Sequence, residues 1–116
     1  GINPLHGQRL WETFMEKSPV AVSLQDDSGK FVFVNNRWLE SFSPDQVTWK
    51  GMTAMEIFPP DAAYLMRQTD LLCLEEGKTL EYNVSFSHCQ RVQNTRRITK
   101  FRYLGPDERA MYFQWR

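Results

Sequence analysis

The alternation of apolar and polar residues along the chain predicts a sheet with helices gathered in its middle. Strand-like runs bounded by turn residues occupy residues 20–25, 30–34, 80–86, 95–104 and 109–115. Apolar residues at helical spacing, with capping and breaking residues, predict helices at residues 8–17, after Asn35, after Ser43, at 53–58 and at 61–76. This order predicts an α+β domain. Its single five-stranded antiparallel sheet would carry short helices and one longer helix on one face, plus an N-terminal helix.

Four residues at the junctions of these elements have the chemistry of turns and caps. An Asp-x-x-Gly turn between the first two strands needs a small polar residue at its start, Asp26, and a residue that adopts positive φ, Gly29. Asn35 stands where a strand passes into a helix and can accept hydrogen bonds from free backbone N–H groups. Gly51 separates two short helices. We interpret these four residues as determinants of the fold and not as a binding site.

The order and spacing of these marks resemble those of the PAS (sensory box) domain. The match runs from about Trp11 to Trp115, and it is carried by the segments FMEKSPVAVSLQDDSGKFVFVNNRWLESF, VTWKGMTAMEIFPPD, EEGKTLEYNVSF and YLGPDERAMYFQW. The resemblance implies a sensory or regulatory domain of a bacterial-type signal transduction protein. Such a domain senses a small ligand or relays a signal to a fused output domain, which is a histidine kinase, a cyclic-dinucleotide enzyme or a transcription regulator.

Length and composition indicate one globular domain, residues 1–116, in which residues 1–7 are expected to be a tag remnant or linker. The sequence has neither a signal peptide nor an apolar run near the roughly 18 residues of a membrane span, so we expect a cytoplasmic location and no membrane contact. The two cysteines are expected to be reduced. The absence of an initial Met and the end at Arg116, directly after an apolar strand, indicate a domain excised from a larger signalling protein.

The resemblance implies a ligand site between the inner face of the sheet and the helices. We expect an apolar space there, into which Tyr82 places one hydroxyl group. Its lining is expected to be Met55, Phe58, Leu65, Met66, Leu72, Tyr82, Val84 and Phe101. A core filled by its own side chains, without a ligand, fits the sequence equally well, so the cofactor stays unknown.

Known PAS cofactors need residues that this sequence lacks at the matching positions. The LOV-type flavin adduct needs a Cys in an Asn-Cys-Arg motif, and residues 52–57 hold no Cys. Haem usually takes an axial His from the long helix, and residues 61–76 hold no His. We interpret His88 and Cys89 as a polar loop pair and Cys73 as a core thiol, and we predict no metal site.

Motifs and charge favour a binding module over an enzyme or a nucleic-acid binder. The sequence holds no defined Ser/His/Asp or Cys/His set and no phosphate-binding glycine loop. The net charge of zero hides an uneven distribution. Residues 1–90 hold seven basic and twelve acidic residues, a net charge of −5, and residues 91–116 hold seven basic and two acidic residues, a net charge of +5. Alternation in the fourth strand assigns Phe101 and Tyr103 to the core and Lys100 and Arg102 to the outer face. The basic residues are therefore expected to meet a partner domain and not RNA or DNA.

The opening helix and the last strand are candidates for partner contact and signal relay. Leu10, Trp11 and Phe14 form an apolar helix face that can pack against another subunit. Trp115 adjoins the exit from the domain, so movement of the last strand would pass a signal on. We therefore expect a homodimer. The nearest alternative is a ligand-free dimerisation or protein-interaction module, and a small α+β enzyme or a nucleic-acid binder is less favoured.

Overall fold

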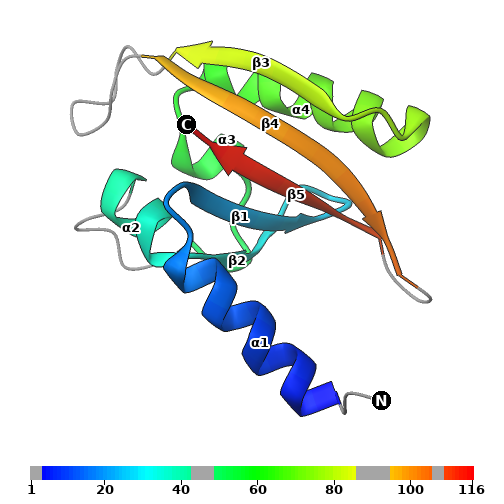
Figure 1. Ribbon diagram of the computed structural model, residues 1–116. Helices are drawn as coiled ribbons and strands as arrows, with labels where there is room; N and C mark the ends of the chain where they lie inside the picture. Colours follow the sequence, from blue (N-terminus) through cyan, green and yellow to red (C-terminus); the bar gives the residue numbers. More distant parts are fainter. Residues whose placement is uncertain (1–3, 43–48, 86–94, 106–108) are drawn as a thin grey trace.

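The computed structural model describes residues 4–42, 49–85, 95–105 and 109–116, with side chains from Arg9 onward. In chain order the elements are α1 (Pro4–Lys17), β1 (Ala21–Asp26), β2 (Phe31–Val34), α2 (Asn36–Phe42), α3 (Ala54–Ile57), α4 (Pro60–Glu76), β3 (Leu80–Ser85), β4 (Thr95–Leu104) and β5 (Arg109–Trp115). The strands form one antiparallel sheet in the order β2-β1-β5-β4-β3 (Figure 1). The predicted α+β architecture with a five-stranded antiparallel sheet is confirmed.

Helices α2, α3 and α4 cover one face of the sheet, which we call the inner face, while α1 runs away from the sheet toward the N-terminus (Figure 1). Helix α1 begins at Pro4, earlier than the predicted start at residue 8, because proline is well tolerated in the first turn of a helix. The helical turn predicted after Ser43 lies outside the described residues. Within the described part of the chain, no helix is long and apolar enough to cross a membrane.

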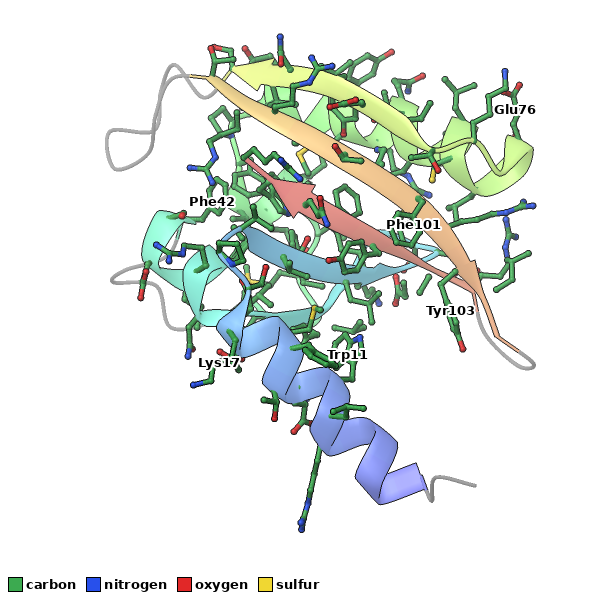
Figure 2. The ribbon with its side chains drawn as sticks, in the orientation of Figure 1. Trp11, Lys17, Phe42, Glu76, Phe101 and Tyr103 are labelled. Carbon is green, nitrogen blue, oxygen red and sulfur yellow. The ribbon has the colours of Figure 1, made fainter. Side chains whose placement is uncertain are left out.

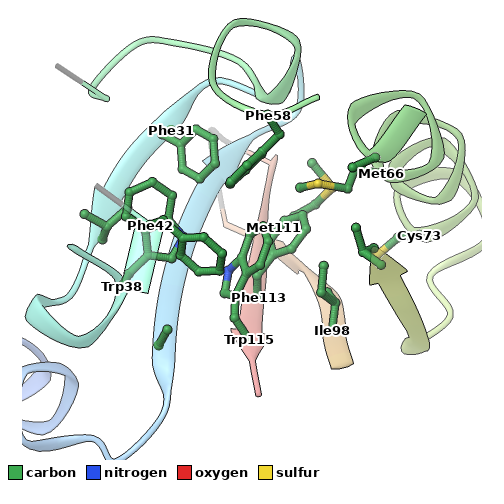
Figure 3. Packing of buried hydrophobic residues seen from close by; sticks show 14 of the residues in the cluster. Phe31, Trp38, Phe42, Phe58, Met66, Cys73, Ile98, Met111, Phe113 and Trp115 are labelled. Carbon is green, nitrogen blue, oxygen red and sulfur yellow. The ribbon is translucent and has the colours of Figure 1, made fainter. Parts of the chain in front are cut away.

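An aromatic cluster fills the core between the sheet and helices α2 and α3 (Figure 3). The rings of Trp38, Phe42, Phe58 and Trp115 contact one another with centroids 4.9–6.4 Å apart. Tilted and edge-on contacts of this kind add about 0.5–1.5 kcal/mol each beyond the burial of the rings. Trp115 Nε1 also donates to Ser23 Oγ at 2.9 Å, which joins β5 to β1. The cluster therefore fixes α2 and α3 on this half of the sheet.

Asn35 fixes the junction between β2 and α2. Its Oδ1 accepts hydrogen bonds from the N–H groups of Val22 at 2.9 Å and Trp38 at 3.0 Å. Its Nδ2 donates to the carbonyl oxygens of Met15 at 2.8 Å and Val20 at 3.0 Å. An amide side chain offers two donor hydrogens and an acceptor oxygen with two lone pairs, so Asn35 makes all the hydrogen bonds that its side chain can make. One buried side chain thus ties the end of α1 to β1 and α2.

The turn between β1 and β2 rests on Asp26 and Gly29. Asp26 Oδ1 accepts hydrogen bonds from the N–H groups of Ser28 at 3.0 Å and Lys30 at 2.9 Å. Burial raises the pKa of Asp26, but the hydrogen bond from Ser28 Oγ at 2.7 Å, the two backbone hydrogen bonds and the charge of Lys30 together lower it below its ordinary value. Gly29 has φ of 89°, and Gly51 has φ of 79°. A side chain at either glycine would strain the backbone.

Candidate functional site

A lysine and an aspartate form an ion pair inside the core, between β4 and α4. Lys100 on β4 is 0% exposed, and Asp70 on α4 is 3% exposed. Lys100 Nζ donates to Asp70 Oδ1 and to Thr69 Oγ1, each at 2.5 Å, and to the carbonyl oxygen of Met66 at 3.0 Å. An ammonium group has three donors, so each of them has an acceptor on the same stretch of α4.

Aromatic rings and helix backbone surround this ammonium group. Lys100 Nζ lies 5.0 Å from the ring centroid of Tyr82 and 5.1 Å from that of Phe113. Both distances are within the range of a cation–π contact. Arg67 Nη1 lies 3.9 Å from Asp70 Oδ2, and the Arg67 side chain is 39% exposed. Aromatic rings therefore cover the ion pair on the side of the sheet, and the partly exposed Arg67 lies beside it on α4.

Burial acts against both charges of the pair. Burial raises the pKa of Asp70 above 3.8, and the charge and hydrogen bond of Lys100 oppose that shift. Burial likewise lowers the pKa of Lys100 below 10.5, and Asp70 opposes that shift. A buried pair of this kind often stabilises a fold no more than well-packed apolar side chains of the same volume do. Stability alone therefore does not explain why the core holds these two charges.

Four buried side-chain polar atoms make no hydrogen bond to the described residues. They are the hydroxyl group of Tyr82 on β3, the Oε1 atom of Gln25 on β1, Arg96 Nε on β4 and Trp38 Nε1 on α2. Burial raises the pKa of the Tyr82 hydroxyl. The neighbouring Thr69 hydroxyl donates instead to the carbonyl oxygens of Leu65 at 2.9 Å and Met66 at 3.0 Å. A buried polar group without a partner costs about 1–3 kcal/mol. These atoms are therefore places where a bound molecule would gain a hydrogen bond.

Two arginines from the closing hairpin hold the end of α4. Arg102 Nη1 and Arg109 Nη2 donate to the carbonyl oxygen of Leu74 at 2.9 and 3.1 Å. The last carbonyl groups of a helix have no partner within it, and cations are favourable beside them. Strands β4 and β5 are thus both attached to α4, by Lys100 in its middle and by the two arginines at its end.

Several solved structures share this arrangement of sheet, helices and core. The PAS domain of an HTR-like protein from Haloarcula marismortui has a TM-score of 0.74 at 17% identity, over 95% of this chain and 90% of that one. A PAS domain from a two-component sensor histidine kinase has a TM-score of 0.73 at 8% identity, over 98% of both chains. The phage VqmA-DPO complex has a TM-score of 0.74 at 15% identity, over 95% of this chain and 52% of that one.

The chain has a PAS fold. The resemblance seen in the sequence is confirmed at this level, although no family model and no curated protein matches the sequence. Within the PAS fold, the Lys100–Asp70 pair lies between the inner face of the sheet and the long helix α4. That is the space in which the sequence predicts a ligand site.

The PAS fold brings only half of the predicted pocket residues into this space. Phe58, Met66 and Val84 are buried in the core, and Tyr82 packs against them. The other four side chains are 40–59% exposed and do not line the interior; they are Met55, Leu65, Leu72 and Phe101.

The inner face of α4 differs from the predicted apolar stripe. Its buried residues are Ala62, Ala63, Met66, Asp70, Cys73 and Leu74. The helix turns Asp70 toward Lys100, which leaves Leu65 and Leu72 on its exposed flanks. Asp70 follows Met66 by four residues and precedes Cys73 by three, which is the spacing of a single helix face. That spacing is the signal in the sequence that identifies Asp70 as an inward-facing residue.

The predicted faces of β4 are wrong. Lys100 pairs with Phe113 across the β4–β5 ladder, and residues directly opposite each other lie on the same face of a sheet. Phe113 is 0% exposed, so Lys100 points inward, and Arg102, two residues further, lies on the same side and reaches α4. Phe101 and Tyr103 point outward and are 41% and 50% exposed (Figure 2).

The candidate relay residues divide into surface and core. Leu10, Trp11 and Phe14 are exposed on α1, as the helical spacing predicts. Trp115 is 0% exposed and packs in the aromatic cluster, so it cannot contact a partner directly. Any part that it plays in a relay must act through the core.

Of the cysteine and histidine candidates named from the sequence, the structure describes Cys73. Cys73 is buried, and burial raises the pKa of its thiol, which keeps it in the unreactive protonated form. His88 and Cys89 lie outside the described residues. Where side chains are described, no group of three or more His, Cys, Asp or Glu residues could hold a metal ion.

Proposed function

We propose that this PAS domain senses a small ligand beside Lys100 and relays the signal to a fused output domain in a cytoplasmic signalling protein. The observation that carries the proposal is the buried ion pair of Lys100 and Asp70, with the hydroxyl group of Tyr82, which has no hydrogen-bond partner among the described residues, beside it. Two further facts support it: similar PAS domains belong to sensor histidine kinases, and VqmA, which shares the fold, is bound to DPO.

The contacts of Lys100 suggest how ligand binding would change the structure. All three of its acceptors lie on α4, so a ligand that accepts a hydrogen bond from Lys100 must replace one of them. Such a replacement alters the contact between α4 and β4. Strand β5 pairs with β4 from Arg109 to Trp115 and leads to the end of the described chain. A ligand that favours one arrangement of α4 therefore shifts the population of β5 positions.

We also propose that the domain works as a homodimer. The exposed apolar face of α1 supports this, since Leu10 and Phe14 are 43% and 62% exposed. The same observation favours the second candidate function, a ligand-free dimerisation module. In that case the Lys100–Asp70 pair would serve only to join α4 to the sheet.

A binding experiment separates the two functions. Small molecules released from the purified domain by denaturation are identified by mass spectrometry, and thermal shifts are measured with 2-pyridone and benzamide, which carry one carbonyl oxygen each. We expect a released molecule or a concentration-dependent rise in melting temperature. The released molecule and the rise in melting temperature should each be lost in the Asp70→Leu, Lys100→Met double variant. Each should be kept in Lys78→Met, whose side chain is 68% exposed. If no molecule is released and no thermal shift depends on Lys100, the domain is a ligand-free dimerisation module.

A further inference from the structure

Helix α4 carries exposed apolar side chains on the side that faces away from the core. Figure 3 shows Met66 and Cys73 pointing from α4 into the core. The large apolar side chains on the other side are 63%, 40%, 37% and 47% exposed; they are Tyr64, Leu65, Leu71 and Leu72. Single exposed apolar residues are common on proteins, but several on one side of a helix form the kind of patch that binds a partner.

Spacing arranges these four side chains in two rows along α4. Residues seven positions apart make nearly two full turns of a helix, so they lie almost in line along its axis. One row holds Tyr64 and Leu71, and the other holds Leu65 and Leu72. Adjacent residues of a helix are about 100° apart, so a gap separates the two rows.

A row of polar residues fills the gap between the apolar rows. Its members, Asp61, Gln68 and Glu75, are also seven residues apart. Residues three and four positions further along a helix lie on either side of the starting residue, so Tyr64 and Leu65 flank Asp61. Asp61 and Glu75 are separated by about 21 Å along the axis. We call these three rows the α4 surface; it is apolar on both sides and negatively charged at both ends of its middle row.

The two charges of the α4 surface are not neutralised within the described part of the chain. Neither Asp61 nor Glu75 forms an ion pair with another described residue. Arg67 is the one basic residue of α4, and it turns toward the sheet. Its Nη1 lies 3.9 Å from Asp70 Oδ2 and donates to the carbonyl oxygen of Asp27 at 3.5 Å. The α4 surface therefore complements a surface that is both apolar and basic.

We infer that the α4 surface binds an amphipathic helix of another protein, in which basic residues stand among apolar ones. A helix laid along α4 meets the two apolar rows with its own apolar side chains. It also needs a Lys or Arg opposite each of Asp61 and Glu75. Because both helices have the same rise per residue, these two basic residues are about fourteen positions apart. The inference goes beyond ligand sensing and rests on neither the proposed ligand nor the proposed homodimer.

A second copy of the chain fits the α4 surface poorly. In an antiparallel pair of α4 helices around a two-fold axis at Gln68, Asp61 of one copy would lie opposite Glu75 of the other. In a parallel pair, each carboxylate would lie opposite its own equivalent. Both arrangements bring like charges together, which acts against such a partner. The same charges disfavour nucleic acids and anionic membranes, because both carry phosphate groups.

Binding of a designed peptide tests the inference. The probe is a fluorescein-labelled helical peptide of 18 residues that repeats the rows of the α4 surface with opposite charge. It has Lys at positions 2 and 16, Gln at position 9, Leu at positions 5, 6, 12 and 13, and Ala and Gln elsewhere. The control peptide has Glu at positions 2 and 16. Fluorescence anisotropy should show that the domain binds the Lys peptide at least about tenfold more tightly than the Glu peptide, and that added salt reduces this preference.

Variants of α4 locate the binding surface. Tyr64→Glu and Leu72→Glu each place a charge in one apolar row and should weaken binding of the Lys peptide at least about tenfold. Tyr103→Glu is the matched control, because Tyr103 is 50% exposed on the outer face of the sheet, and it should bind as the unmodified chain does. The charge reversal Asp61→Lys, Glu75→Lys should exchange the preference, so that the Glu peptide binds more tightly. Circular dichroism checks that each variant is folded.

The failures that would overturn the inference are distinct. They are no binding of the Lys peptide, equal binding of the two peptides, or an affinity that the α4 variants leave unchanged. Self-association that light scattering detects in the unmodified chain and not in Leu72→Glu, without peptide binding, would assign the α4 surface to a second copy instead.

Discussion

Replacing Lys100 with Met removes one charge of the buried pair and keeps the length of the side chain. Asp70 would then be left 3% exposed without its partner, and the nearest remaining cation is Arg67, whose Nη1 lies 3.9 Å from Asp70 Oδ2. Breaking a buried ion pair by removing one partner costs about 3–5 kcal/mol. We expect the free energy of unfolding at pH 8 to fall by about that amount, a large share of the roughly 5–15 kcal/mol that holds a small domain together.

The loss in Lys100→Met should depend on pH. Burial raises the pKa of Asp70, and the positive charge of Lys100 opposes that rise. Without Lys100, the pKa of Asp70 in the folded state therefore lies further above the unfolded value of 3.8. A folded state that binds the proton more tightly is most stable below the unfolded pKa and loses stability as the pH rises through the folded pKa. The deficit should therefore be small near pH 4 and grow toward pH 8, by at most about 1.4 kcal/mol per pH unit.

A double variant separates charge from packing. Asp70→Leu combined with Lys100→Met leaves no uncompensated charge, and such replacements are often neutral or stabilising by about 1–4 kcal/mol. Urea unfolding followed by tryptophan fluorescence at pH 4, 6 and 8 measures each difference, with Lys78→Met as the exposed control. A loss below about 1 kcal/mol at pH 8 for Lys100→Met would refute the reasoning. So would a double variant as unstable as the single one.

Three further variants or measurements test other parts of the fold. Asn35→Ala leaves the buried N–H groups of Val22 and Trp38 unpaired, so urea unfolding should show a loss of about 2–4 kcal/mol, and a loss under about 1 kcal/mol would contradict the junction described here. Gly77→Ala should lower the melting temperature, because Gly77 has φ of 68° and a Cβ there would lie 2.5 Å from Arg102 Nη2; an unchanged value would contradict this. Cys73 should react with a thiol reagent only after unfolding, because burial raises its thiol pKa; rapid reaction in the native domain would show that it is accessible.

The order of elements could be predicted from the sequence because its signals are local. Alternation with period two sets a strand, and the turn at Gly29 and the helix end at Gly77 have the positive φ that only glycine adopts easily. Asn35 likewise acts on neighbours close in the chain or one strand away. These features need no knowledge of how distant segments pack.

The faces of β4 and α4 could not be predicted by the same means. In residues 95–104 one face holds Phe101 and Tyr103 and the other holds Lys100 and Arg102, so hydrophobicity assigns the rings to the core. The structure does the opposite because Lys100 finds three acceptors on α4. Each misplaced residue depends on the other element, since Asp70 is tolerated inside only with a cation and Lys100 only with a carboxylate. The misplaced pocket residues on α4 and β4 therefore have one cause, whereas Met55 lies on α3 and is not explained by this pair.

The proposed ligand site and the exposed rings of the outer face meet in β4. Lys100 points inward to α4, and Phe101, the next residue, points outward and is 41% exposed. Consecutive Cα atoms are about 3.8 Å apart, so a shift of β4 that changes the contact of Lys100 also moves Phe101. Binding free energies coupled through one element are reciprocal. If the proposed homodimer covers this outer face, a ligand that displaces an acceptor of Lys100 changes the dimerisation constant by the same factor by which dimerisation changes the affinity for that ligand. In the Asp70→Leu, Lys100→Met double variant this coupling should vanish while the dimer itself remains.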